Sequence, residues 1–124
     1  SYTSLHIWKQ ARHLMINIYL MVQRFPRSEP TGLARHLALA AVSVPTQIAN
    51  ATTKTDVEWR IRCLNQACED LHTLEQQLYL ARDFGYCSEE DMEANQLQAA
   101  ELEQRLRFLT HQLQSLLIQA ESAY

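Results

Sequence analysis

Histidine is the residue in this chain best suited to bind a metal ion, and the 124 residues contain five of them. They are His6, His13, His36, His72 and His111. None stands three or four residues from another, which is the spacing that puts two side chains on one face of a helix. His6 and His13 are seven residues apart and share roughly one side of a helix, but two histidines alone do not complete a zinc site. We therefore expect no metal and no cofactor.

Carboxylates at helical spacing could bind iron or carry out acid–base catalysis. Glu69 and His72 form one Glu-x-x-His unit of the kind found in di-iron bundles, but the second copy that such a site needs is missing. Glu69, Asp70 and Glu75 are close in sequence, whereas acid–base catalysis needs two carboxyl groups in different environments around a pocket. A solvated helix face explains these residues better.

The thiols and glycines also offer little for catalysis. A catalytic cysteine needs a histidine beside it, and Cys63 and Cys68 fall in an apolar-patterned segment. With Cys87 the cysteines are odd in number and irregularly spaced, which argues against a disulfide framework and favours a reducing, cytoplasmic environment. Gly32 and Gly85 are the only glycines, so no glycine-rich phosphate loop is possible. We expect a protein that is not an enzyme and has no catalytic residue.

Positive charge is concentrated in the first half of the chain. Residues 1–62 contain eight Lys and Arg against three Asp and Glu, and residues 63–124 contain three against eleven, within a net charge of −3. The ordinary interpretation is two differently solvated faces. A sharper hypothesis is a basic surface for an anionic partner, because phosphate binding needs several converging cations. The candidate residues for nucleic-acid or partner binding are Arg24, Arg27, Arg35, Lys54, Arg60 and Arg62.

The elements that must position these side chains are long helices. Hydrophobic residues make up 47% of the chain, and two Gly and three Pro leave few turns. Leu, Ala, Gln, Glu and Arg dominate, and these are strong helix formers. The length fits one domain, which we expect to cover residues 1–124. No signal peptide is evident, and no apolar run approaches the roughly 20 residues of a membrane span, so no membrane contact is expected.

Apolar residues repeat at helical spacing in four segments, three of them with a period of seven. The series that we expect to be buried are Ile7, Leu14 and Met21; Leu64, Leu71 and Leu78; Leu102, Leu109 and Leu116; and, in the second segment, Leu33, Leu37, Ala40, Val44, Ile48 and Ala51. The expected helices cover about residues 4–25, 31–51, 56–84 and 89–119. Ser4, Thr55 and Ser88 are the expected N-terminal caps, because a hydroxyl there accepts a hydrogen bond from the first helical turn. Gly85 is the expected left-handed stop of the third helix.

Pro45 falls inside the second helix. Proline removes one hydrogen bond and clashes with the carbonyl of Ala41, which costs about 3 kcal/mol in an ordinary helix. We expect a kink there, because the apolar period continues across it; the alternative is two shorter helices that meet at Pro45.

Seven-residue stripes on long helices indicate nearly antiparallel packing at about 20°. With short connections, the sequence predicts an all-α, antiparallel up-down-up-down four-helix bundle with a proline-kinked second helix. In this bundle we expect Arg24, Arg27 and Lys54 near one end. Several apolar residues lie off the stripes and favour a second apolar face and self-association. They are Trp59, Ile61, Tyr79, Leu80, Leu97, Leu117 and Ile118.

The order of several motifs resembles a bacterial family of four-helix-bundle proteins. The motifs extend over about residues 5–115, and the most specific are Ala-Val-Ser-Val-Pro at 41–45 and Leu-Glu-x-Gln-Leu at 74–78. Others are Ile7-Trp8-Lys9, Phe25-Pro26, Gly32-Leu33 and Gly85-Tyr86. Members of that family are encoded in intervening sequences of large-subunit ribosomal RNA genes, and one is the accessory variability determinant of diversity-generating retroelements.

The resemblance implies a ring-shaped homopentamer without enzyme activity. For the retroelement member it implies binding to nucleic acid and to a reverse transcriptase through a basic surface. We therefore expect a homo-oligomeric adaptor that binds RNA or a ribonucleoprotein. The chain departs from the family at Ala38 and Leu39, where a basic pair is usual. This departure favours the alternative, a protein-only scaffold in which Leu39 and its neighbours meet another protein.

Overall fold

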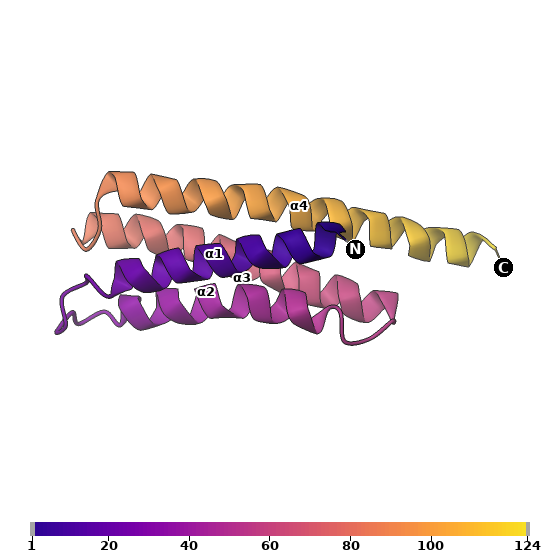
Figure 1. The fold of residues 1–124 in the computed structure, drawn as a ribbon, viewed down its shortest axis with the longest axis horizontal. Coiled ribbons are helices and arrows are strands. Elements are labelled where there is room, and N and C mark those ends of the chain that lie inside the picture. Colours follow the sequence, from indigo (N-terminus) through magenta and orange to yellow (C-terminus); the bar gives the residue numbers. More distant parts are fainter. Residues whose placement is uncertain (1, 124) are drawn as a thin grey trace.

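The computed structural model describes residues 2–123, with side chains from residue 4 onward (Figure 1). Its four α-helices are α1 (Tyr2–Val22), α2 (Leu33–Asn50), α3 (Val57–Asp83) and α4 (Glu89–Ser122). No strand occurs within residues 2–123. The expected all-α, four-helix fold is confirmed.

Each helix packs against two others, in the cyclic order α1, α2, α3, α4 and back to α1. Consecutive helices run in opposite directions along the long axis of the molecule (Figure 1). The 18 residues of α2 carry the chain through about 27 Å at 1.5 Å per residue. The connection before α2 and the connection after it therefore lie at opposite ends of the bundle.

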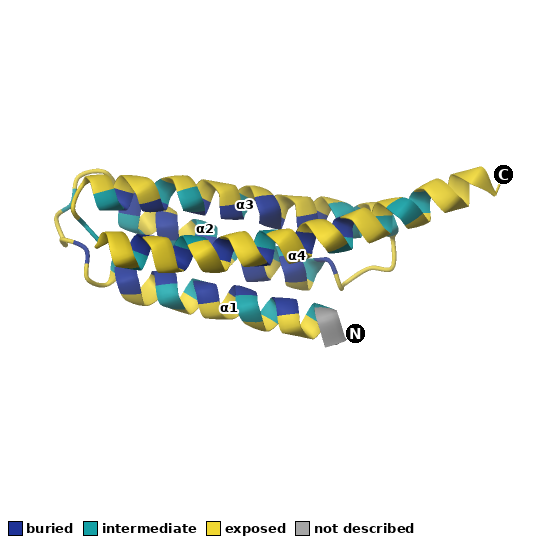
Figure 2. Cartoon of the chain, turned by 90° about the horizontal axis from the view of Figure 1, so that it is seen from above, coloured by how far each residue is buried: buried dark blue, intermediate teal, exposed yellow. Residues whose placement is uncertain are grey.

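The core is built from the predicted seven-residue series. Ile7, Leu14 and Met21 on α1 are buried, as are Leu64, Leu71 and Leu78 on α3. On α4, Leu102 is buried and Leu109 half-buried, but Leu116 is 53% exposed, so its predicted place in the seam is wrong. The end of α4 extends beyond the other three helices (Figure 2), and Leu116 borders an open hollow together with Ala51 and Leu64. On α2, Ala41 is buried in place of the predicted Ala40, which is half-buried.

The ends of α3 and α4 confirm two predictions and correct one. Ser88 Oγ accepts a hydrogen bond from the backbone N–H of Asp91 at 3.0 Å, as expected of the α4 cap. Gly85 has φ +76°, and beyond it the N–H of Tyr86 donates to the carbonyl of Ala81 at 2.8 Å, which closes the end of α3. Asp56, not Thr55, caps α3, because Asp56 is the last extended residue and its carboxylate accepts from the N–H of Glu58 at 3.2 Å.

The start of α1 and the path of α2 also differ from the sequence prediction. Helix α1 already begins at Tyr2, so Ser4 lies inside it and does not cap it. Helix α2 continues through Pro45 to Asn50, which excludes two separate helices meeting there. Pro45 and Ala41 are both buried. The proline ring therefore packs in the core, although it removes one hydrogen bond from the helix. A kink at Pro45 stays a prediction.

Over the described part of the chain, none of the helices combines the length and the apolar character that crossing a bilayer requires.

Candidate nucleic-acid and partner interfaces

The six cations predicted to bind a partner are divided between the two ends of the bundle. Arg24, Arg27 and Arg35 belong to the α1–α2 connection and the first turn of α2. Lys54, Arg60 and Arg62 belong to the α2–α3 connection and the first two turns of α3. The prediction that Arg24, Arg27 and Lys54 share one end is therefore wrong, since the whole length of α2 separates the two connections (Figure 1).

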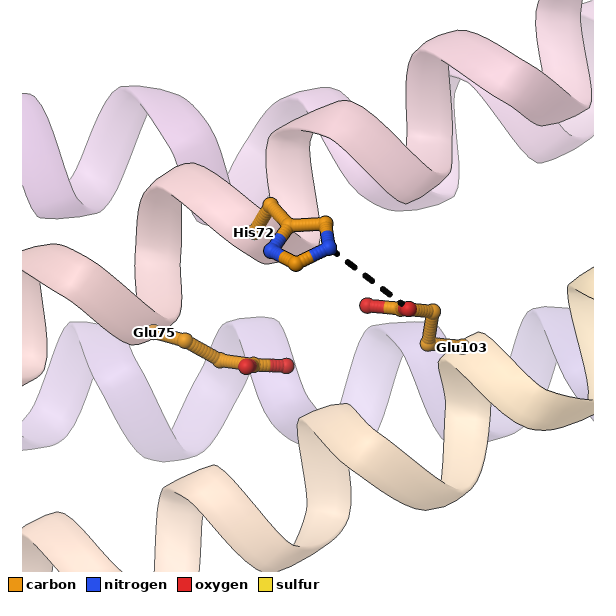
Figure 3. A group of neighbouring side chains, drawn as sticks. All are labelled: His72, Glu75 and Glu103. Carbon is orange, nitrogen blue, oxygen red and sulfur yellow. Dashed lines mark ion pairs between the residues drawn. The ribbon is translucent and has the colours of Figure 1, made fainter.

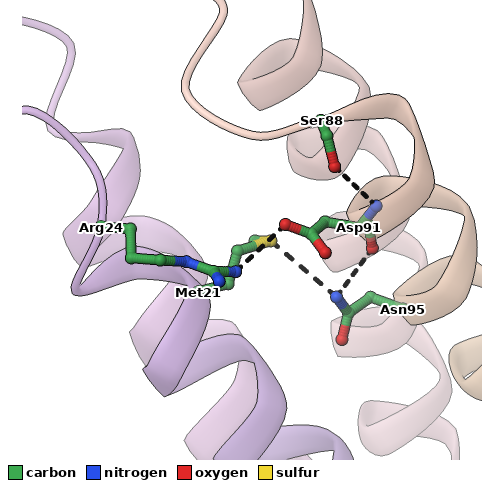
Figure 4. A network of polar contacts seen from close by, with 5 residues as sticks. All are labelled: Met21, Arg24, Ser88, Asp91 and Asn95. Carbon is green, nitrogen blue, oxygen red and sulfur yellow. Dashed lines mark hydrogen bonds and ion pairs between the residues drawn. The ribbon is translucent and has the colours of Figure 1, made fainter.

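Arg24 links the end of α1 to the start of α4 (Figure 4). Its guanidinium forms an ion pair with Asp91 of α4, with 3.0 Å between the nitrogen and the oxygen. The carbonyl of Asp91 accepts a hydrogen bond from the side chain of Asn95 at 2.8 Å, and Ser88 accepts from its N–H. Arg24 and Asp91 are both solvent-accessible, so the pair contributes at most about 1 kcal/mol to stability. It does, however, neutralise one of the three candidate cations at this end, Arg24.

The N-terminus of α2 is already occupied by a carboxylate. Glu29 Oε1 accepts from the backbone N–H groups of Thr31 at 2.8 Å and Gly32 at 2.9 Å, and Glu29 Oε2 accepts from Ala34 at 3.3 Å. The Thr31 hydroxyl and these N–H groups lower the pKa of Glu29. The free N–H groups that make a helix start attractive to phosphate are thus used internally. This carboxylate between Arg27 and Arg35 makes the α1–α2 end a poor anion site.

The α2–α3 end has a different arrangement, in which two cations lie against the Trp59 ring and a third, Arg60, is bonded to the backbone of one of them. Lys54 Nζ lies 4.1 Å from the centre of the Trp59 ring, and the guanidinium carbon of Arg62 lies 5.7 Å from it. Arg60 Nε donates to the carbonyl of Lys54 at 2.8 Å, and Trp59 Nε1 donates to the carbonyl of Asn50 at 3.0 Å. The indole is therefore fixed against the end of α2 and holds the cations near one another. We call Lys54, Trp59, Arg60 and Arg62 the Trp59 cluster.

In the described part of the chain, the cations of the Trp59 cluster form no ion pairs, although two carboxylates stand in the same segment. Within residues 4–123, none of its three cations forms an ion pair with a carboxylate. Asp56 and Glu58 lie in the same segment, but the Asp56 carboxylate is directed to the first turn of α3 as its cap. The sequence placed Trp59 only among the off-stripe apolar residues, and nothing in the one-dimensional pattern showed that Lys54 would lie over its ring.

A second candidate interface is apolar and lies over α1 and α2. A shallow groove there is lined by Met15, Ile16, Tyr19, Ala38 and Val42. Leu39 follows Ala38 and lies one turn before Val42, on the same side of α2. Of these, Tyr19 is 56% exposed, Leu39 55% and Val42 50%. We call Met15, Ile16, Tyr19, Ala38, Leu39 and Val42 the α1–α2 apolar face.

The off-stripe residues that favoured a second apolar face from the sequence lie elsewhere. Tyr79, Leu80, Leu97 and Ile118 are exposed on α3 and α4, while Trp59, Ile61 and Leu117 are half-buried. The apolar face over α1 and α2 is formed by other residues, two of which, Ala38 and Leu39, stand where the resemblance leads one to expect basic side chains.

The cysteines occupy protected positions. All three are free thiols; Cys63 and Cys68 are buried and Cys87 is half-buried. Burial raises the pKa of Cys68 and of Cys87, so both favour the unreactive thiol over the thiolate. This arrangement suits small apolar residues in a core.

The fold and these surfaces define a four-helix-bundle protein whose two candidate interfaces, the Trp59 cluster and the α1–α2 apolar face, both lie on the surface of the bundle. Comparison with known sequences specifies it further: the chain belongs to the 23S rRNA-intervening sequence protein family, whose match covers residues 3–107. The resemblance found in the motifs is thereby confirmed. A search of curated proteins finds no match.

The fold is shared with a solved structure. A protein of unknown function from the S23 ribosomal protein family of Bacteroides thetaiotaomicron VPI-5482 superimposes with a TM-score of 0.82. The match covers 88% of this chain and 98% of that one, at 15% sequence identity. At this identity the likeness concerns the fold alone.

Proposed function

We propose that the protein is a non-enzymatic, homo-oligomeric adaptor that binds RNA or a ribonucleoprotein. The observation that supports this function most directly is the Trp59 cluster, in which three cations lie together without carboxylate partners. Membership of a family named for 23S ribosomal RNA intervening sequences agrees with an RNA partner.

The chemistry of the Trp59 cluster suits a phosphate backbone. Arginine presents a planar set of donors that can bind phosphate oxygens in pairs, and lysine adds a point charge. Each phosphate that these side chains neutralise releases counterions, which makes the affinity depend on salt. Assembly into the pentamer implied by the resemblance would present several copies of the cluster to one RNA, and linked sites increase the apparent affinity.

The test is a titration of a labelled, structured RNA with the full chain at two salt concentrations, followed by fluorescence anisotropy. We expect binding tighter than about 10⁻⁴ M at physiological salt, because non-specific RNA binders already reach that affinity. Replacing Lys54 and Arg62 together by Gln should weaken binding and reduce the slope of log affinity against log salt by about one for each lost contact.

Arg105→Gln is the matched control, because Arg105 is an exposed cation on α4 without an ion-pair partner among the described residues. It should bind RNA as the wild type does. Wild-type binding weaker than about 10⁻⁴ M would remove RNA as the partner, and equal salt slopes for all three proteins would remove the Trp59 cluster as its binding site.

The α1–α2 apolar face favours a second candidate, a protein-only interaction scaffold. Exposed Leu39 and Val42 offer nothing to a phosphate but could pack against another protein. Purification of the tagged protein from its native host, with and without nuclease, separates the two candidates. A protein partner that survives nuclease treatment supports the scaffold, and one that is lost supports the ribonucleoprotein.

A further inference from the structure

Three potential metal ligands meet on the surface where α3 packs against α4. His72 and Glu75 are three residues apart on α3 and so share a face, and Glu103 approaches them from α4. One ligand atom from each residue lies within 4.8 Å of the other two, and His72 Nε2 is 3.8 Å from Glu103 Oε2. Figure 3 shows the three side chains converging on the space between the two helices.

The two carboxylates of this group are incompletely compensated. Glu103 is mostly buried, with 17% of its side chain exposed, and it accepts a bond from Arg107 Nε at 2.9 Å. The carboxylate of Glu75 has no hydrogen bond or ion pair within residues 4–123. Burial raises the pKa of Glu75, the nearby Glu103 adds to the rise, and His72 opposes it. A cation bound between the two carboxylates would relieve their repulsion.

We propose that His72, Glu75 and Glu103 form a binding site for a divalent transition-metal ion of the zinc type. Imidazole nitrogen and carboxylate oxygen bind zinc at about 2.0–2.2 Å, which puts tetrahedral ligands about 3.3–3.6 Å from one another. One ligand atom of each residue lies within 4.8 Å of the other two, so modest side-chain rotations would bring the three to that separation. Mixed nitrogen and oxygen ligands suit zinc, manganese, iron or cobalt better than calcium or magnesium.

The neighbouring groups are compatible with a bound ion. The hydrogen bond from Arg107 falls on Glu103 Oε2, the same oxygen that lies 3.8 Å from His72 Nε2, so Glu103 would bind the metal through Oε1 while Oε2 keeps the bond from Arg107. The His72 side chain is 61% exposed, which leaves further coordination positions open to water. The site joins α3 to α4 and should stabilise the folded chain by mass action when metal is present. It is independent of the Trp59 cluster, which contains none of its residues.

The sequence pattern did not reveal this group. It drew attention to Glu69 and His72, but Glu69 is exposed and does not belong to the three. The third ligand comes from another helix, and its position depends on how α4 is placed against α3.

The test is calorimetric titration of the full chain with ZnCl₂ after treatment with EDTA. We expect one zinc ion per chain and a higher melting temperature in zinc than in EDTA. His72→Gln and Glu103→Gln should each weaken binding by at least about tenfold, since even changes outside the first coordination sphere cost that much. His111→Gln and Glu69→Gln are controls on the same two helices and should bind zinc as the wild type does.

Cobalt gives a readout that does not depend on the variants folding. With the proposed nitrogen and oxygen ligands, Co²⁺ bound to the wild-type chain should show weak visible bands and no thiolate-to-cobalt charge-transfer band. An intense charge-transfer band would overturn the ligand set and point to a thiol such as Cys68, one turn before His72. Zinc affinity unchanged by His72→Gln, or an affinity of the wild-type chain for Mg²⁺ equal to its affinity for zinc, would reduce the group to an acidic patch and overturn the proposal.

Discussion

Glu29, in the α1–α2 connection, caps the N-terminus of α2 from outside the helix. The residue directly before α2 is Gly32, which has φ +72° and no side chain to cap the helix. Glu29 instead accepts bonds from backbone N–H groups of Thr31, Gly32 and Ala34, as well as from the Thr31 hydroxyl. A carboxylate near a helix start also interacts favourably with the helix dipole. One side chain therefore fixes the whole turn.

Glu29→Gln should destabilise the protein in a pH-dependent way. The folded state lowers the pKa of Glu29 below its ordinary value of 4.5, so the ionised carboxylate stabilises the fold above that pH. This stabilisation is lost as the pH falls through the lowered pKa. Urea unfolding at neutral pH should show the variant less stable than the wild type, and the difference should shrink at a pH of about 3.

Glu93→Gln is the matched control, because Glu93 is an exposed carboxylate on α4 without a hydrogen bond in the described chain. Its stability difference should stay small at both pH values. A Glu29→Gln difference that is the same in acid and at neutral pH would contradict the role of the charge.

At the scale of single residues, the sequence predicted what depends on near neighbours. Ser88 and Gly85 were predicted correctly, because a cap and a left-handed stop follow from one residue and the turn beside it. Glu29 was missed, because its bonds span a loop whose path the sequence does not determine. Trp59 was missed for a similar reason, since Lys54 reaches its ring from across a turn.

At the scale of elements, the seven-residue seams predicted the buried faces of α1 and α3 well. A seam is buried only where its neighbours fill the space, and Leu116 is exposed because it borders an open hollow that it lines together with Ala51 and Leu64. On α2 the sequence pattern could not predict whether Ala40 or Ala41 is buried, because two adjacent alanines have the same hydrophobicity. Periodicity thus locates a face to within one residue and cannot give its length.

Leu74→Ala and Leu97→Ala compare the loss of unfolding free energy at a buried and at an exposed leucine. Leu74 on α3 is fully buried, so its truncation should cost about 2–5 kcal/mol of unfolding free energy through lost burial and a cavity. Leu97 on α4 is 63% exposed, and the same truncation there should change stability by less than about 0.5 kcal/mol. Urea unfolding followed by circular dichroism measures both, and equal costs would show that the assigned core is wrong.

At the scale of the whole molecule, the two candidate interfaces lie in the basic first half of the chain. The Trp59 cluster and the α1–α2 apolar face belong to α1, α2 and the start of α3, whereas the carboxylates of the second half continue along α3 and α4. The sequence showed this division of charge, but it could not place each connection at its end of the bundle. That placement follows from the length of α2, and it separates Arg24 and Arg27 from Lys54 (Figure 1).

At the same scale, the exposed α1–α2 apolar face predicts that the protein associates with copies of itself. Tyr19, Leu39 and Val42 are each at least half exposed in the single chain, and contiguous apolar side chains of this kind mark interaction surfaces. In the homo-oligomer that we propose, other copies of the same chain would cover this face. In a closed ring every subunit uses the same contact, so one substitution weakens all contacts at once.

Leu39→Lys should therefore dissociate the oligomer while leaving each chain folded. A lysine charge buried in an apolar contact without a partner destabilises that contact, whereas in a separate chain the same side chain is solvated at a position already 55% exposed. Light scattering on a size-exclusion column should give a multiple of the chain mass for the wild type and a mass near one chain for the variant. Leu97→Lys, on exposed α4, is the control and should keep the wild-type mass. A wild-type mass near one chain, or equal masses for the two lysine variants, would show that the α1–α2 apolar face does not hold copies together.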